Sequence, residues 1–303
     1  MDTPYRFCRL NRVVSVVVAG LLMGLQTSAF AVDASNFSFD AGLRWEDNLS
    51  LSPNSEDKVS DLITHVSFAA DFAMVETETN QFSTHINAHY DYVTDTSDLS
   101  NYGVQIAALY QHNFGPDFSS PWLTIGADGQ VREYKDSDIR DGFIFNISVA
   151  MGRQLNPKVG ISGGYRNFMR RSTFENSTQQ QMNWRSDEVF DLNRHNLFVR
   201  LDFIANENMT VYGDLNYFDG DVAASGTSFV NGTDFPRAWD RVFGNDYLAW
   251  RIDATGYEAK LGMGYAFNEK ISMDAFVSYL SASGESNNDY DNTVIQALFS
   301  YQF

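Results

Sequence analysis

The stretch QFSTHINAHYDYV, residues 81–93, alternates between two kinds of side chain. One set is largely apolar or aromatic and consists of Phe82, Thr84, Ile86, Ala88, Tyr90 and Tyr92. The other set is polar and consists of Ser83, His85, Asn87, His89 and Asp91. Side chains along a β-strand point alternately to opposite faces, so this pattern predicts a strand with one apolar and one polar face.

The same period of two recurs along the chain, for instance over residues 37–45, 62–74, 143–151, 197–203 and 257–267. It predicts an all-β chain of about 12 strands, with the segment around 123–131 the weakest and ten or fourteen strands as alternatives. The connections alternate between short turns, such as 155–158 and 268–270, and long loops, of which 219–249 is the longest.

The polar face of these strands carries charged residues such as Arg44, Asp128, Arg132 and Glu258, which do not suit the packed interior of a soluble sandwich. Long strands, alternating connection lengths and aromatic residues at the strand ends are typical of an outer-membrane barrel. We therefore predict a transmembrane antiparallel up-and-down β-barrel with an apolar outside and a polar lumen.

The first 31 residues have the features of a secretory signal peptide. Arg6, Arg9 and Arg12 precede an apolar stretch from Val13 to Leu25, and Ala29-Phe30-Ala31 is a small-x-small cleavage site. We expect residues 32–303 to form a single barrel domain. Because the only cysteine, Cys8, lies in the predicted signal peptide, we expect neither a disulfide nor thiol catalysis in that domain.

The C-terminal segment ALFSYQF, residues 297–303, resembles the last strand of Gram-negative outer-membrane proteins, with aromatic side chains at Phe299, Tyr301 and Phe303. This resemblance implies a bacterial outer-membrane location, where lipid and lipopolysaccharide surround the barrel. It also implies that the barrel-assembly machinery reads these three residues and that periplasmic chaperones deliver the chain.

The predicted lumen suggests the function. Eight side chains of the polar face are expected to line it: Arg132, Arg166, Arg200, Asp71, Asp91, His65, His85 and His89. Basic and acidic residues fall on different strands, and such an arrangement sets up a field that orients polar solutes in a narrow channel. We expect a porin-like transport protein for small polar solutes. The formal charge of −18 makes nucleic acid an unsuitable partner.

Two alternatives remain open. His65 and Ser67 resemble the His-x-Ser pair of outer-membrane phospholipases and lipid A deacylases, but they share the inward parity of Asp71, whereas those enzymes direct the pair outward. A barrel lumen is polar in any case, so His and Ser side chains meet there by chance without catalysis, and we expect no enzyme. The segments Trp45–Asn48 and Ser60–Ile63 are similar to the first hairpin of barrels from exopolysaccharide loci, which implies a role in polysaccharide export.

Three histidines, His65, His85 and His89, lie on neighbouring predicted strands. Their spacing specifies no coordination geometry, so we expect neither a metal site nor a cofactor.

Overall fold

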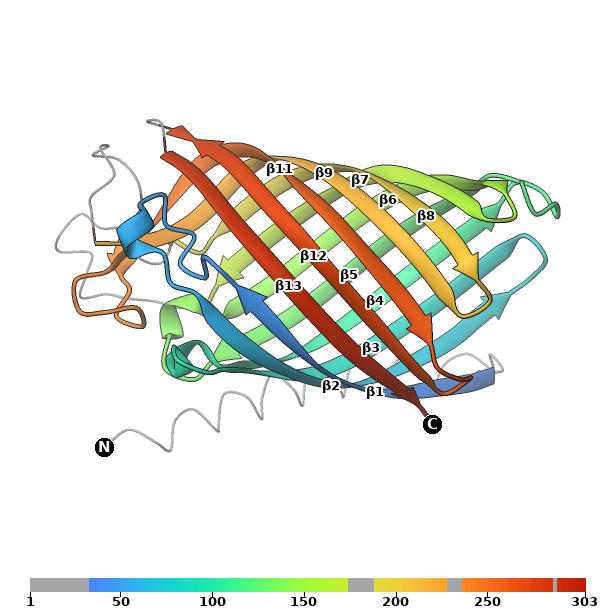
Figure 1. Ribbon diagram of the computed structural model, residues 1–303, viewed down its shortest axis with the longest axis horizontal. Coiled ribbons are helices and arrows are strands. Elements are labelled where there is room, and N and C mark those ends of the chain that lie inside the picture. Colours follow the sequence, from blue (N-terminus) through green and yellow to red (C-terminus); the bar gives the residue numbers. More distant parts are fainter. Residues whose placement is uncertain (1–32, 174–187, 228–235, 286–287) are drawn as a thin grey trace. The chain divides into compact units, whose positions relative to one another are not determined.

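Twelve long antiparallel strands follow one another around a barrel, and a thirteenth, short strand lies in the longest connection (Figure 1). The computed structural model describes residues 33–173, 188–227, 236–285 and 288–303, and residues 34–303 form one compact unit. The strands are β1 (Asp33–Glu46), β2 (Asp61–Glu76), β3 (Asn80–Val93), β4 (Asn101–Asn113), β5 (Trp122–Tyr134), β6 (Gly142–Asn156), β7 (Val159–Ser172), β8 (Leu192–Asn206), β9 (Met209–Gly226), β10 (Arg237–Trp239), β11 (Leu248–Ala266), β12 (Ile271–Gly284) and β13 (Asn288–Gln302). The prediction of an antiparallel barrel of about 12 strands is therefore confirmed, including the weakly patterned β5.

Two pairings close the sheet. β1 pairs with β13, so that Phe39 faces Tyr301, and β9 pairs with β11, so that Gly226 faces Leu248. Each long strand thus has a hydrogen-bonding neighbour on both sides. Closure leaves no open sheet edge, which a hydrocarbon environment would not tolerate.

The outer face of the barrel is apolar, as the alternation predicts. Large side chains such as Leu197, Leu215 and Leu261 are 58%, 64% and 60% exposed, a level that would be unfavourable over so many residues in water. Aromatic side chains, among them Phe114 and Phe267 at one end and Tyr92 and Tyr102 at the other, are exposed near the strand ends. This is the outer surface that a bilayer would cover.

The strands extend further at the long-loop end than the sequence indicates. β9 continues to Gly226 and β11 begins at Leu248, so the connection expected over 219–249 is shorter in the structure. The reason is continuous pairing between these two strands as far as Gly226 and Leu248. β12 ends at Gly284, which pairs with Ala254 of β11. Residues 248–250 of β11 therefore have no partner on β12 and pair with β10 instead.

Three short 3-10 turns lie in the long connections: η1 (Ser55–Asp57), η2 (Ser97–Leu99) and η3 (Asp138–Arg140). No helix in the described part of the chain is long and apolar enough to cross a membrane.

Adjacent residues on β4 test the assignment of the two faces. Ile106 has the outward parity of Tyr102 and Tyr110, whereas Gln105 donates to Asp128 Oδ2 across the inner face at 3.2 Å. Ile106→Arg should lower the free energy of unfolding in lipid by about 2–4 kcal/mol, since an arginine would face hydrocarbon. Gln105→Arg should cost much less because Asp128 can pair with it. Reversible urea unfolding in lipid vesicles measures both, and equal losses would contradict the assignment.

Candidate functional site in the barrel interior

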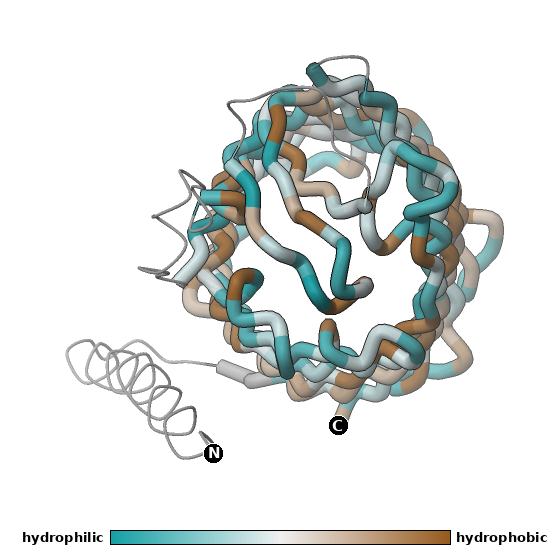
Figure 2. Tube along the Cα trace, turned by 90° about the vertical axis from the view of Figure 1, so that its left-hand side faces the viewer, coloured by the Kyte–Doolittle hydropathy of each residue, from teal (hydrophilic) through white to brown (hydrophobic). Residues whose placement is uncertain are grey.

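Residues 236–247, here called the mouth loop, cross the barrel at its long-loop end. The loop begins at β10 beside β11, yet Val242 and Phe243 pack against the cluster of Ile63, Val93 and Leu99 on β2, β3 and η2, on the other side of the barrel. Figure 2, which looks in from this end, shows chain segments inside the ring of strands. The mouth loop therefore narrows the entrance instead of extending into solvent.

A buried ion pair fixes the mouth loop. Asp240 is completely buried, and its carboxylate accepts hydrogen bonds from the guanidinium of Arg140 and, at 2.5 Å, from the hydroxyl of Ser225. Arg140 lies on η3 after β5, and its guanidinium also stacks on the rings of Phe190 and Phe243. Removing one member of a buried ion pair leaves an uncompensated charge, which costs about 3–5 kcal/mol.

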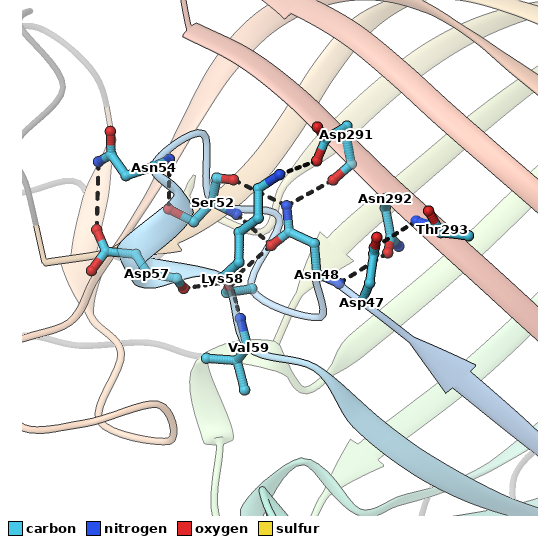
Figure 3. A network of polar contacts seen from close by, with 11 residues as sticks. Asp47, Asn48, Ser52, Asn54, Asp57, Lys58, Val59, Asp291, Asn292 and Thr293 are labelled. Atoms are coloured by element: carbon cyan, nitrogen blue, oxygen red, sulfur yellow. Dashed lines mark hydrogen bonds and ion pairs between the residues drawn. The ribbon is translucent and has the colours of Figure 1, made fainter.

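Residues 47–60, here called the first loop, are held against β13 (Figure 3). The side chain of Asn48 is fully buried; its Nδ2 donates to the carbonyl oxygens of Ser52 and Asp291, at 3.0 and 2.7 Å. Its Oδ1 accepts from Ser50 Oγ and Ser52 N, both at 3.0 Å, so the amide uses most of its capacity. Lys58 adds an ion pair to Asp291. Asn48, the last residue of the Trp45–Asn48 segment, therefore has a structural role, and the link of this segment to polysaccharide export stays a prediction.

The first loop contacts both the end of β9 and the connection that follows it. Ser225 N donates to Ser50 O at 2.9 Å, and Thr227 Oγ1 donates to Asp57 Oδ1 at 2.6 Å. Tyr247 Oη donates to Asp57 O at 3.4 Å, and burial, with the charge of Asp57 as a second cause, raises the pKa of the Tyr247 phenol. The phenol therefore stays protonated and keeps this hydrogen bond at neutral pH. The two loops form one hydrogen-bonded cover over part of the mouth.

Below this cover, β2 and β3 carry the histidines and acids predicted from the sequence. His65 Nδ1 lies 2.6 Å from Asp91 Oδ1, and His85 Nδ1 lies 2.7 Å from Asp71 Oδ1. The ring of His89 stacks on that of His65 with centroids 6.1 Å apart, and Gly103 on β4 leaves the space that His89 occupies. The structure thus forms two separate groups, His65 with Asp91 and His89, and His85 with Asp71, at different positions along the same two strands. Within the described residues, no group of three or more His, Cys, Asp or Glu side chains is arranged to hold a metal.

Ser67 is not placed as a nucleophile. It is 5% exposed, and its hydroxyl donates to Asp40 Oδ2 on β1 at 2.9 Å, while His65 is engaged with Asp91. A serine nucleophile needs its hydroxyl proton directed to an imidazole base. The geometry of this pair is therefore that of two separate hydrogen bonds in the wall.

The other side of the lumen is basic and aromatic, and we call Arg166, Phe168, Arg194, Phe198 and Phe218 the Arg–Phe wall. The Arg166 guanidinium lies 5.6 Å from the centroid of the Phe198 ring. That of Arg194 lies 5.0 and 5.2 Å from Phe168 and Phe218. A cavity of about 270 Å³ is lined by four of these residues, Arg166, Phe168, Arg194 and Phe218, and also by Asn146, Asn196, Asn216, Glu258, Ser278, Leu280, Asn292 and Val294.

The remaining predicted arginines have different surroundings. Arg200 Nε lies 2.9 Å from Asp202, and its Nη1 lies 3.6 Å from Asp214 on β9. Arg132 lies close to the side chain of Tyr134 and to the carboxylate of Asp91. Of the three arginines predicted to line a pore, Arg166 alone borders the cavity. That all eight predicted residues line an open pore stays a prediction.

Sequence reasoning missed Arg194 and the mouth-loop residue Asp240. A usable signal for Arg194 was present: Phe168, Phe198 and Phe218 fall on the polar parity of their strands and interrupt its polar character. No comparable signal marks Asp240, because its partner Arg140 is a hundred residues away.

Residues 119–303 match the family described as "Outer membrane protein beta-barrel domain". The chain belongs to this family. The barrel is accordingly a protein of the bacterial outer membrane. No curated protein matches the sequence.

Solved structures of similar architecture are distant in sequence. An outer membrane channel from Pseudomonas putida F1 superimposes with a TM-score of 0.54 and 12% identity, covering 92% of this chain and 98% of that one. The KdgM porin gives 0.46 and 10%, covering 88% and 99%. The Salmonella typhi outer membrane phospholipase, a dimer with bound calcium, gives 0.41 and 7%, covering 91% and 93%. The first of these likenesses supports the fold and carries nothing about function.

A charge-matched pair of variants tests how the mouth loop is fixed. Asp240→Asn should free the loop, because the amide cannot neutralise Arg140, and backbone hydrogen exchange over 236–247 should accelerate by tenfold or more, for roughly 3 kcal/mol lost. Asp246→Asn removes the same charge from an exposed position of the same loop and should leave exchange unchanged. Equal exchange in both variants would show that the buried ion pair does not hold the loop.

Proposed function

We propose that this barrel is a narrow, porin-like channel for small polar solutes. The observation that carries the proposal is a polar cavity inside a closed barrel, below a mouth narrowed by a loop rather than by the strands themselves. Twelve strands lie between the roughly eight of a barrel filled by side chains and the roughly 16 of an open porin. A lumen of that width with a cover at one end suits selective passage of one small solute at a time.

The proposed pathway has two unlike sides. On β2 and β3, His65, His85 and His89 alternate with Asp71 and Asp91. On β7 and β8, the Arg–Phe wall presents positive charge to the cavity. Such a transverse arrangement orients a dipolar or charged solute without binding it so tightly that it cannot leave.

Two further proposals concern how the chain reaches the membrane. Residues 1–31 serve as a signal peptide that is removed after export from the cytoplasm. Phe299, Tyr301 and Phe303 of the C-terminal strand serve as the signal recognised during barrel assembly, with periplasmic chaperones as carriers. The outward exposure of all three rings supports this role, because a recognition factor could reach them before lipid does.

Planar-bilayer recording tests the channel. Asp240 N donates to Tyr247 O at 2.9 Å, so residues 241–246 can be replaced by Asn-Gly, a two-residue turn. We expect a small single-channel conductance for the unaltered protein and a larger one for this variant, because the mouth loop would no longer reach the opposite wall.

The matched control shortens a turn at the other end of the barrel. Phe114 N donates to Pro121 O at 2.9 Å, and replacing residues 116–119 by Asn-Gly should leave the conductance unchanged. Absence of conductance from the unaltered protein and from the variant with a shortened mouth loop would refute the channel.

A lipid assay tests the expectation that the protein is not an enzyme. Since Ser67 directs its proton to Asp40, purified protein should release no fatty acid from phospholipid or lipid A, with or without added calcium. Release that is abolished by both Ser67→Ala and His65→Ala would instead establish a hydrolase.

A further inference from the structure

The two arginines that border the lumenal cavity differ from Arg44 and Arg200 in their ionic partners. Neither Arg166 nor Arg194 has a carboxylate within ion-pair distance among the residues that the structure describes. In contrast, Arg44 pairs with Glu46, and Arg200 with two aspartates. Nε of Arg194 is buried without a hydrogen-bond partner, but so is Nε of Arg44, Arg132, Arg140 and Arg170, so the site is marked by the cavity and by the lack of a carboxylate partner among the described residues.

Strand register explains why these two differ from Arg200. The cross-strand neighbours of Arg166 are Ser148 and Asn196, which are both neutral. Those of Arg194 are Phe168 and Gly220. Arg200, by comparison, faces Asp214 directly. The alignment of the strands therefore places neutral residues beside both arginines, so the positive charge at the cavity does not depend on the conformation of a loop.

The aromatic rings hold both guanidinium groups without neutralising them. A guanidinium over a ring face gains cation–π energy while the N–H groups at its edge remain available. Phe218 is 1% exposed and lies against Gly256, where an added Cβ would approach its ring to 2.6 Å. The rings that hold Arg194 are thus packed in place, and so is the direction of its donors.

The other lining groups narrow the class of solute. Glu258 is the one carboxylate of the cavity lining, so two guanidiniums and one carboxylate leave one net positive charge. The amides of Asn146, Asn196 and Asn216 both donate and accept hydrogen bonds, as hydroxyl groups require. A volume of about 270 Å³ lies just below the roughly 300–1,000 Å³ of pockets for drug-sized ligands.

We propose that this cavity binds a monoanionic, hydroxyl-rich solute of about the size of a monosaccharide, whose carboxylate bonds to Arg166 and Arg194. The proposal specifies the solute class of the channel proposed above and rests on that function. The asparagine amides bond to the hydroxyl groups, and the phenylalanine rings cover the less polar face of the solute.

Equilibrium binding of labelled glucuronate to the purified, refolded protein in detergent micelles tests the proposal, with glucose as the uncharged analogue. Glucuronate should bind at least tenfold more tightly than glucose, because glucose leaves both guanidiniums without an acceptor. Absence of glucuronate binding, or equal affinity for glucose, would overturn the proposal.

Variants of both charge types locate the site. Arg166→Gln and Arg194→Gln should each weaken glucuronate binding by roughly tenfold. Glu258→Gln should strengthen it, since the repelling carboxylate is removed, and misfolding could not produce that result. Arg44→Gln removes an arginine already paired with Glu46 and should leave the affinity unchanged. If Arg44→Gln weakens glucuronate binding as much as Arg166→Gln and Arg194→Gln do, then binding depends on the net charge of the protein and not on this cavity.

The binding site and the channel can be refuted independently of each other. Micelle binding needs no ion flow, so a protein that binds glucuronate but does not conduct would refute the channel and retain the site. A protein that conducts but does not bind glucuronate would retain the channel and refute the site.

Discussion

The constraint on which this structure depends is that no backbone polar group can be left unpaired in hydrocarbon. The pairings of β1 with β13 and of β9 with β11 satisfy it by removing both edges of the sheet. Once the sheet is closed, the period of two divides the side chains between lipid and lumen. Charged residues within the hydrocarbon-spanning part of a strand then have to face the lumen, so they lie close to one another in a narrow space.

Within that space, most charges are matched locally. His65 and Asp91, His85 and Asp71, and Arg200 with Asp214 are cross-strand neighbours, so the register that closes the barrel also supplies the partners. The mouth uses longer connections for the same purpose, because Arg140 and Asp240 meet only after the mouth loop has crossed the barrel. Local pairs stabilise the wall, and the long-range pair determines how wide the entrance is.

The sequence was sufficient to predict the strands and their two faces, which depend on the alternation of side chains. It was insufficient to predict contacts between strands, which depend on how the strands align. Alternation located β1 to β9 and β11 to β13 and separated Phe68 on the outside from Ser67 within the wall. It could not show that Ser67 bonds to Asp40, because that contact depends on how β1 and β2 align. Nor could it show that the mouth loop turns inward, since its contacts with Ile63 and Val93 join segments far apart in the chain. Among the arginines, Asp202 lies two residues after Arg200 and so on the same strand face, but the neutral neighbours of Arg166 appear only in the register.

The phenylalanines of the polar parity explain how unpaired arginines can be retained. A desolvated guanidinium is costly, and a carboxylate would offset that cost but would also cancel the charge. A ring face contributes about 0.5–2 kcal/mol and leaves the charge and the edge donors in place. Phe168, Phe198 and Phe218 therefore do for Arg166 and Arg194 what Asp202 and Asp214 do for Arg200, except that they keep the site ready for an external anion. In a lumen where acids are available on neighbouring strands, the choice of rings over acids is what distinguishes a binding surface from a salt-bridged wall.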